Sequence, residues 1–202
     1  MSSIVYTFGG KPYLNLTNQC PCACVFCLRG LQDGVGSARS LWHEEEPGWE
    51  EIEAALAGWD FSHSQASEVV FCGYGEPMCA LEHVKRAAGW LKERHPQIKL
   101  RLDTNGLGDL IHGRPTACEL AGLIDAVSIS LNAPNAVRYH ALVRSPWGEA
   151  AFDAMLRFAR DCRVCVPGLT FSVVGVLTEE EIDQCREIAR GFGAPLRVRG
   201  RG

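Results

Sequence analysis

The sequence predicts an α/β fold with parallel strands, namely a partial (β/α)6 TIM-like barrel that forms a single domain over residues 1–202. The first observation is that short apolar runs alternate along the chain with segments of helical periodicity. The second is length, because 202 residues suffice for one sizeable core but fall short of the roughly 250 typical of a complete eight-stranded barrel. The third is that polar or glycine-containing motifs follow several of the predicted strands.

Six segments have the composition of strands and five have that of helices. The predicted strands comprise residues 13–17, 68–72, 98–102, 126–131, 170–176 and 196–198. The predicted helices cover residues 48–59, 81–95 and 115–123, a segment around 152–159, and a segment that follows Thr178. In the last of these, Thr178 and Glu181 have the spacing of a capping box, and Gly191 marks the helix end.

Strands that alternate with helices form parallel sheets with right-handed crossovers, and ligands bind at the carboxyl ends of such strands. We therefore expect the motifs at the strand ends to share one site. Residues 29–47 are polar, irregular and longer than a typical connection. This segment is either a lid or binding loop, or a mobile surface excursion.

Composition excludes several classes of protein. A net charge of −4 offers no electrostatic reason to expect a nucleic-acid or membrane partner. The N-terminal residues lack the basic and apolar regions of a signal peptide, and no apolar run has membrane-spanning length. Ten cysteines without a secretion signal then indicate a reducing, cytoplasmic location.

Four of the ten cysteines lie between positions 20 and 27. Cys20, Cys24 and Cys27 have a C-x3-C-x2-C spacing, with Phe26 directly before the last cysteine and Cys22 inside the motif. Thiolates this close in sequence favour a shared soft metal. In a four-iron cluster, three cysteines bind three irons and leave the fourth iron open for chemistry.

Other uses of these cysteines are less favourable. A zinc site made of all four is unfavourable, because structural zinc prefers two well-separated cysteine pairs. A disulfide framework belongs to short secreted chains. A non-catalytic zinc or iron–sulfur binding module with a structural or regulatory role remains the alternative function, and it would need no polar residues at the other strand ends.

The motif and its surroundings, Leu-Thr-Asn-Gln-Cys-Pro-Cys-Ala-Cys-Val-Phe-Cys-Leu-Arg, resemble the radical S-adenosylmethionine (radical SAM) superfamily and, within it, a small family associated with TatD-type hydrolases. The resemblance implies that Cys20, Cys24 and Cys27 bind a [4Fe–4S] cluster whose open iron chelates the amino and carboxylate groups of SAM. The reduced cluster then cleaves SAM to a 5′-deoxyadenosyl radical that abstracts hydrogen from a substrate. It further implies low oxygen and an electron donor of the flavodoxin or ferredoxin type. The resemblance also implies the partial (β/α)6 barrel that the periodicity predicts.

The turn Gly73-Tyr74-Gly75-Glu76-Pro77 is similar to the family's GGEP element, which binds the amino group of SAM. A backbone carbonyl and the Glu76 carboxylate suit a cationic ammonium group. Tyr74 departs from the usual glycine pair, and this leaves open which carbonyl binds. Without the cysteine motif, the segment would equally be a plain turn from strand to helix.

The next two strand ends also carry polar residues. Asp103 and Asn105 follow the third predicted strand, where they form either an Asx turn or polar contacts to SAM or substrate. Ser128, Ser130 and Asn132 alternate along the fourth and therefore share a face. By resemblance Ser130 and Asn132 bind the ribose of SAM, and the alternative is hydrogen bonding to neighbouring strands.

Two further residues are candidates by resemblance. Arg144, in the loop before the helix around 152–159, could meet the SAM carboxylate or be a surface arginine. Phe26 should pack beside adenine, and the alternative is simple packing within the loop. No residue is assigned a catalytic role.

The remaining cysteines give weaker signals. Cys72 is adjacent to the glycine turn and lies near the expected site. Cys162 and Cys165 form a C-x2-C pair without a second pair, which argues against another cluster. A third group is interpreted as small buried hydrophobic residues, comprising Cys79, Cys118 and Cys185.

The sequence does not identify the substrate, which is either a small molecule or a partner protein. A short, open barrel favours a large or protein substrate, because a small molecule needs a closed chamber. The segment 29–47 or a second copy of the chain could close it.

Overall fold

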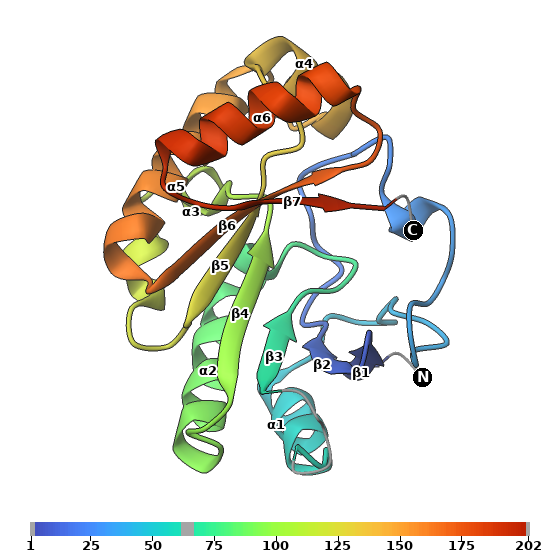
Figure 1. Ribbon diagram of the computed structural model, residues 1–202. Coiled ribbons are helices and arrows are strands. Elements are labelled where there is room, and N and C mark those ends of the chain that lie inside the picture. Colours follow the sequence, from blue (N-terminus) through green and yellow to red (C-terminus); the bar gives the residue numbers. More distant parts are fainter. Residues whose placement is uncertain (1–2, 62–66, 201–202) are drawn as a thin grey trace. The chain divides into compact units, whose positions relative to one another are not determined.

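The computed structural model describes residues 3–61 and 67–200. Within it the chain forms two compact units of strands and helices (Figure 1). Among the described residues, the first unit comprises 3–20, 28–61, 67–103 and 122–125, and the second comprises 21–27, 104–121 and 126–200. The predicted single domain also includes residues 1–2, 62–66 and 201–202, which lie outside the described residues, and it stays a prediction.

The first unit begins with an antiparallel hairpin that the sequence analysis missed. Strand β1 (Val5–Phe8) pairs with β2 (Lys11–Leu14), so that Val5 lies opposite Leu14. Gly9 and Gly10 join them with φ of 57° and 77°, the positive values that a two-residue hairpin turn requires. The strand expected at residues 13–17 therefore begins earlier, at Lys11, because Lys11 and Pro12 already pair with β1. It also ends earlier, at Leu14.

The rest of the first unit is parallel, as predicted. β2 pairs with β3 (Glu68–Phe71), and β3 pairs with β4 (Lys99–Thr104). In β3 the consecutive residues Val69, Val70 and Phe71 are fully buried, whereas β4 alternates, with Leu100 and Leu102 fully buried. The helices of this unit are α1 (Trp49–Ala57) and α2 (Leu81–Arg94), with the short 3-10 turns η1 (Leu28–Gly30) and η2 (Pro77–Ala80).

The second unit repeats the strand–helix alternation. β5 (Ala126–Ser130), β6 (Gly168–Val174) and β7 (Leu196–Arg199) pair in parallel, and Figure 1 shows α5 (Ala150–Cys165) and α6 (Glu179–Gly191) on the same side of them. The capping box of α6 is confirmed, since Glu181 N donates to Thr178 Oγ1 at 3.2 Å and Thr178 N donates to Glu181 Oε2 at 2.9 Å.

Two helices of this unit were not predicted. The short α3 (Gly108–His112) precedes a 3-10 turn η3 (Ala117–Leu120), which replaces the helix expected over residues 115–123. The second is α4 (Ala136–Val143), where the Asn135 side chain caps the first turn by accepting from Arg138 N at 2.9 Å. An eight-residue helix is too short for a clear apolar periodicity, and only its cap was readable.

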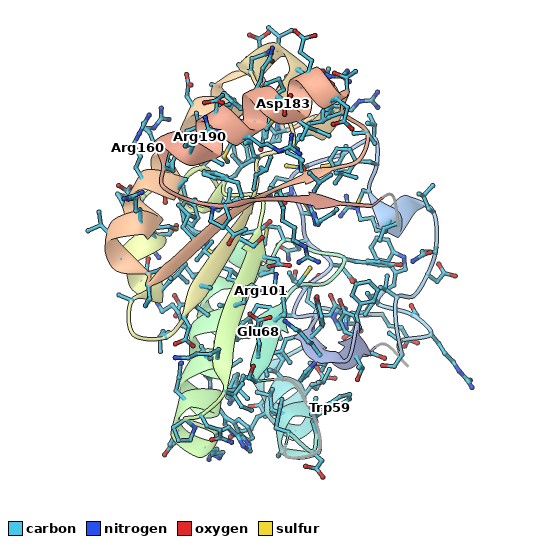
Figure 2. The ribbon with its side chains drawn as sticks, viewed as in Figure 1. Trp59, Glu68, Arg101, Arg160, Asp183 and Arg190 are labelled. Carbon is cyan, nitrogen blue, oxygen red and sulfur yellow. A yellow bond between two sulfur atoms is a disulfide. The ribbon has the colours of Figure 1, made fainter. Side chains whose placement is uncertain are left out.

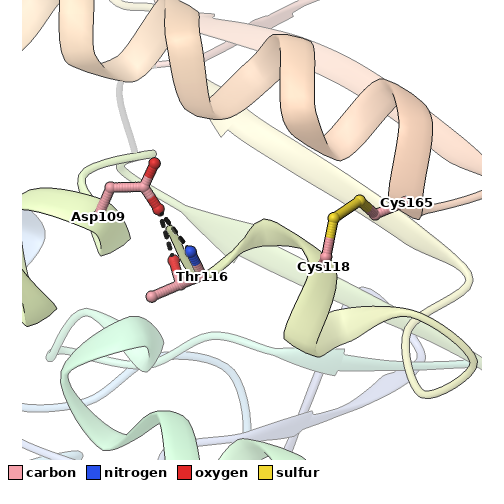
Figure 3. Close-up of a disulfide and its surroundings, with 4 residues drawn as sticks. All are labelled: Asp109, Thr116, Cys118 and Cys165. Carbon is pink, nitrogen blue, oxygen red and sulfur yellow. Dashed lines mark hydrogen bonds between the residues drawn. A yellow bond between two sulfur atoms is a disulfide. The ribbon is translucent and has the colours of Figure 1, made fainter. Parts of the chain in front are cut away.

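A disulfide joins Cys118 in η3 to Cys165 at the end of α5 (Figure 3). Their Cα atoms lie 5.0 Å apart, within the range that a disulfide requires. The prediction that Cys118 is a small buried hydrophobic residue was therefore wrong, whereas Cys185 is fully buried as predicted. Sequence alone gives no pairing of two cysteines separated by 47 positions.

Two other expectations concern the irregular segment and membrane-spanning helices. Residues 31–47 contain neither, which confirms the irregular segment after the cysteine motif. No helix among the described residues is long and apolar enough to span a membrane.

Candidate functional site

In the first unit, the residues that follow β2 and β3 are joined by buried polar contacts. Asn15 is completely buried, and its Nδ2 donates to Leu41 O at 2.6 Å while its Oδ1 accepts from Tyr74 N at 3.3 Å. Glu76 N donates to Gln19 O at 2.7 Å. The glycine turn after β3 is thereby held against the segment that leads into the cysteine motif.

The two glycines of this turn allow this close approach. A Cβ atom on Gly73 would lie 1.9 Å from Asn15 Oδ1, and one on Gly75 would lie 2.2 Å from Thr17 O. Any side chain at either position would collide with these groups. The glycines are thus explained by packing within the first unit, independently of any ligand.

Glu76 is buried and caps η2, where its Oε1 accepts from Met78 N at 3.0 Å. Cys79 lies on the same turn. Burial raises the pKa of the Cys79 thiol to about 12, and the charges of Glu76, Cys20 and Glu46 add to this effect. Cys79 is only half-buried, so its interpretation as a buried hydrophobic residue was wrong in degree.

The backbone of Tyr74 belongs to the glycine turn, whereas its side chain packs into a cluster of buried residues. Its hydroxyl donates to Gln32 O, and its ring meets Trp42 edge-on with centroids 5.3 Å apart. Tyr6 and Leu41 belong to the same buried cluster. The Tyr74 side chain therefore holds the irregular segment 29–47 against the rest of the first unit.

The residues that anchor the approach to the cysteines were not predicted from the sequence. Glu46 accepts from Thr17 Oγ1 at 2.6 Å and from Asn18 N at 2.9 Å. His43 is buried, its Nε2 lies 3.1 Å from Asn15 O, and burial lowers its pKa. The polar residues Asn15 and Thr17, shortly before the motif, were the signal available for such anchors.

The same unit pairs one predicted site residue with an arginine. Arg101 Nη1 lies 2.5 Å from Asp103 Oδ1, and Arg101 Nε lies 3.3 Å from Glu68 Oε2. Glu68 and Arg101 are labelled in Figure 2. Asp103 thus has a structural ion pair, whatever further contact it makes.

In the second unit, the cysteine segment Pro21–Cys27 lies against the end of α4. Ala23 N donates to Val143 O at 3.2 Å, and Val25 N donates to Leu142 O at 2.9 Å. Cys24 and Cys27 are partly exposed, and Cys27 N donates to Cys24 O at 3.1 Å. The helix that was not predicted therefore positions two of the three predicted ligands.

Cys22 differs from the predicted ligands in its environment. It is buried, and its Sγ accepts from Asn105 Nδ2 at 3.7 Å. Cys20, Cys24 and Cys27 are all partly exposed. This contrast matches a three-cysteine ligand set in which Cys22 packs inside the loop.

Asn105 forms the Asx turn considered from the sequence, since its Oδ1 accepts from Leu107 N at 2.8 Å. Its side-chain amide nitrogen contacts Cys22. The side chain of Asn105 therefore supports the cysteine segment.

The carboxyl end of β5 carries an unsatisfied polar group. Asn132 is 4% exposed, and its Oδ1 has no hydrogen-bond partner among the described residues. Its backbone is left-handed, with φ of 55°, a conformation that asparagine tolerates. Because a buried polar atom without a partner is unfavourable, this acceptor fits a ligand that donates a hydrogen bond.

The other candidates lie at the same strand end, at the end of α4 that contacts the cysteine segment, or within that segment. Ser130 Oγ accepts from Arg199 Nη2 at 3.3 Å, whereas Ser128 is buried. Arg144 is exposed, with φ of 51°, at the end of α4. Phe26 is partly exposed.

The described residues contain no group of three Cys, His, Asp or Glu side chains that could hold a single metal ion. A four-iron cluster does not require such a group, because each cysteine binds a different iron. The partly exposed thiols and the unsatisfied Asn132 acceptor fit a cluster and a hydroxyl-bearing ligand respectively.

Comparisons with known proteins agree with this chemistry. The model of the radical SAM superfamily matches residues 14–190. No curated protein matches the sequence.

Among solved structures, native anSMEcpe with bound AdoMet has a TM-score of 0.64 and 14% identity over 93% of this chain and 50% of that chain. The hexahistidine-tagged form of anSMEcpe with bound AdoMet has a TM-score of 0.63 and 17% identity, over 93% of this chain and 48% of that chain. A radical SAM methyltransferase from Sphaerobacter thermophilus has a TM-score of 0.48 and 20% identity, over 97% of this chain and 68% of that chain. The fold prediction, an α/β partial TIM-like barrel, is confirmed by the first comparison, and the chain spans about half the length of anSMEcpe.

Proposed function

The chain belongs to the radical SAM superfamily, whose members use a [4Fe–4S] cluster and SAM, and we propose that Cys20, Cys24 and Cys27 bind the cluster. When bound, these cofactors supply radical chemistry that starts with one-electron cleavage of SAM and leads to hydrogen abstraction from a substrate. We further place the chain in the small family associated with TatD-type hydrolases, because the sequence around its cysteines resembles that family.

The observation that carries the assignment of the SAM site is the unsatisfied Oδ1 of Asn132. A ribose hydroxyl would donate to this oxygen and remove the cost of leaving it without a partner. Ser130 lies two residues earlier on the same strand and contributes a hydroxyl group. Both residues thus orient the nucleoside part of SAM.

Residues of the glycine turn hold the methionine part in this proposal. Because Gly73 and Gly75 have no side chains, a ligand can approach their backbone carbonyls closely. Glu76 supplies a negative charge for the ammonium group. Tyr74 contributes only backbone, since its side chain packs elsewhere. Asp103 and Asn105 act indirectly, through Arg101 and Cys22.

Two side chains near the cysteine segment complete the proposed site. The exposed Arg144 has a guanidinium that suits the SAM carboxylate. Phe26 offers a partly exposed ring for adenine. The contacts of Ala23 and Val25 to α4 fix the segment that carries both Phe26 and the ligands.

The cluster needs an electron donor, which we propose to be a flavodoxin or ferredoxin in an anaerobic cytoplasm. The proposed substrate is a small molecule or a partner protein, and we expect neither a nucleic acid nor a membrane as a partner.

Electron paramagnetic resonance of the anaerobically reconstituted, dithionite-reduced protein tests the proposal. A four-iron signal that changes when SAM is added supports SAM binding at the open iron. A protein that takes up only zinc, or an iron signal that ignores SAM, would contradict it. Replacement of Cys22 by Ala should leave the iron content unchanged, whereas replacement of Cys24 should lower it.

The Asn132 assignment has its own test. Asn132→Gly keeps the left-handed backbone but removes the acceptor, and it should weaken SAM binding roughly tenfold, as expected for about one hydrogen bond. Asn135→Gly, a change of the same type at the exposed cap of α4, is the matched control and should bind SAM normally. Unchanged affinity in Asn132→Gly would remove Asn132 from the site.

A further inference from the structure

Arg199, at the end of β7, carries a charge that no carboxylate neutralises among the described residues. Its Nε is buried and has no hydrogen-bond partner within the part of the chain that the structure describes. Its side chain instead makes a 3.3 Å bond from Nη2 to Ser130 Oγ, a neutral group. A guanidinium has five donor hydrogens, and the buried Nε–H is one that the described residues leave without an acceptor.

Such an arrangement is costly in the absence of a ligand. A buried donor without an acceptor is unfavourable, and a partly buried charge without a counter-charge adds to that cost. A structural arginine would be expected to reach an acid or to extend into water, as the exposed Arg197 does two residues earlier. The Nε–H and an adjacent Nη–H form an edge of the guanidinium that a carboxylate or phosphate satisfies with two parallel hydrogen bonds, and the Nε–H of Arg199 is the one without a partner.

The position of Arg199 associates it with the proposed site. Gly175 N donates to Arg199 O at 2.8 Å, so the end of β7 lies beside the end of β6. Ser172 of β6 accepts from Asn132 N at 3.3 Å and lies opposite Ser130 in the parallel pairing of β5 with β6. An unsatisfied donor, Arg199 Nε, and an unsatisfied acceptor, Asn132 Oδ1, thus occur at the carboxyl ends of β7 and β5, the two strands that flank β6 in the second unit.

We propose that Arg199 binds an oxyanion, a carboxylate or phosphate, of the substrate. The inference rests on the proposed function, in which SAM occupies Asn132 and presents its own carboxylate to the open iron. The acceptor that Arg199 lacks must then come from a second molecule. The substrate class is therefore an anionic compound, or a protein segment with an acidic or phosphorylated side chain.

The test uses inorganic phosphate and acetate as probes on the anaerobic, cluster-loaded protein, with sodium chloride at matched ionic strength as the reference. Thermal unfolding and SAM affinity are measured for the wild type, Arg199→Gln and Arg199→Lys. Arg157→Gln is the matched control, because Arg157 is exposed on α5 and has no ion pair among the described residues.

We expect one probe, at tenfold excess over its dissociation constant, to raise the midpoint of wild-type unfolding by roughly 3 to 6 °C. The same shift should occur in Arg157→Gln, decrease in Arg199→Lys and vanish in Arg199→Gln. A response to phosphate alone identifies a phosphate-bearing substrate, and a response to acetate alone identifies a carboxylate. SAM affinity should be the same in all four proteins.

Three results would overturn the inference. One is the absence of any probe effect in the wild type, and another is an equal effect in Arg199→Gln. The third is a roughly tenfold loss of SAM affinity in Arg199→Gln, which would assign the arginine to the cofactor. Failure of the proposed function is distinguishable, because it appears as a wild-type cluster signal that ignores SAM, irrespective of the response to anions.

Discussion

Replacement of Gly75 by Ala separates a packing role of the glycine turn from a ligand-binding role. The Cβ of alanine would lie 2.2 Å from Thr17 O and 2.7 Å from the Thr17 carbonyl carbon. Real Cβ atoms keep at least 3.0 Å from other heavy atoms, so the turn and the segment after β2 must separate by at least 0.8 Å, the difference between 3.0 and 2.2 Å. Overpacking of this kind costs about 1–3 kcal/mol.

Urea unfolding of the cluster-free protein without SAM measures this cost. Gly75→Ala should lose about 1–3 kcal/mol of the free energy of unfolding, although no ligand is present. Gly89→Ala is the control, because Gly89 lies within α2 and its Cβ would have no neighbour within 4 Å. It should gain about 0.5–1 kcal/mol from helix propensity. A Gly75→Ala protein as stable as the wild type but unable to bind SAM would refute the packing explanation.

Three further predictions concern other parts of the two units. Asn15→Leu should destabilise the protein by about 2–6 kcal/mol in urea unfolding, because it leaves one buried carbonyl and one buried amide without partners, at about 1–3 kcal/mol each. Burial lowers the pKa of His43, so its contribution to stability should be complete above its unfolded pKa of about 6.5 and be lost as the pH falls below that value. Reduction of the disulfide between Cys118 and Cys165 should lower the free energy of unfolding by up to about 4 kcal/mol, the loop-closure value for a separation of 47 residues.

These three predictions have internal controls. An Asn15→Leu protein that unfolds at the wild-type urea concentration would contradict the role of the buried amide. The acid-side slope of stability should flatten in His43→Gln and persist in His140→Gln, since His140 is exposed on α4. A slope that is unaffected by His43→Gln would exclude His43 as its source. Reductant should have no effect on the unfolding of Cys118→Ser, and wild-type stability that is insensitive to reductant would contradict the disulfide prediction.

Strand and helix alternation was predictable because it depends on local periodicity. The long helices α2, α5 and α6 and the parallel strands have apolar positions that only one secondary structure satisfies. The hairpin β1–β2 and the helix α4 were missed because each is defined mainly by its turn or cap. Gly9-Gly10 and Asn135 were the signals available for them.

The sequence predicts candidate site residues where residue type determines chemistry. The cysteine spacing favours a shared soft metal, and the resemblance to the radical SAM motif implies which three thiols are ligands. That ligand set stays a prediction, and the structure adds that Cys22 is buried and Cys24 partly exposed. The sequence could not show that the Tyr74 side chain packs into a core cluster or that Asn105 contacts Cys22. Such contacts join residues 42 and 83 positions apart, and no local pattern encodes them.

The close fit between Gly73 and Asn15 has a consequence for how relatives of this protein diverge. A Cβ at position 73 would occupy the place of the Asn15 amide, so neither position can change in isolation. Among homologous sequences, a larger residue at 73 should occur only together with a smaller one at 15, and loss of the asparagine should be accompanied by changes at Leu41 or His43, which it contacts. The turn after β3 and the segment after β2 should therefore evolve as one inherited character, although 58 positions separate them in the chain (73 minus 15).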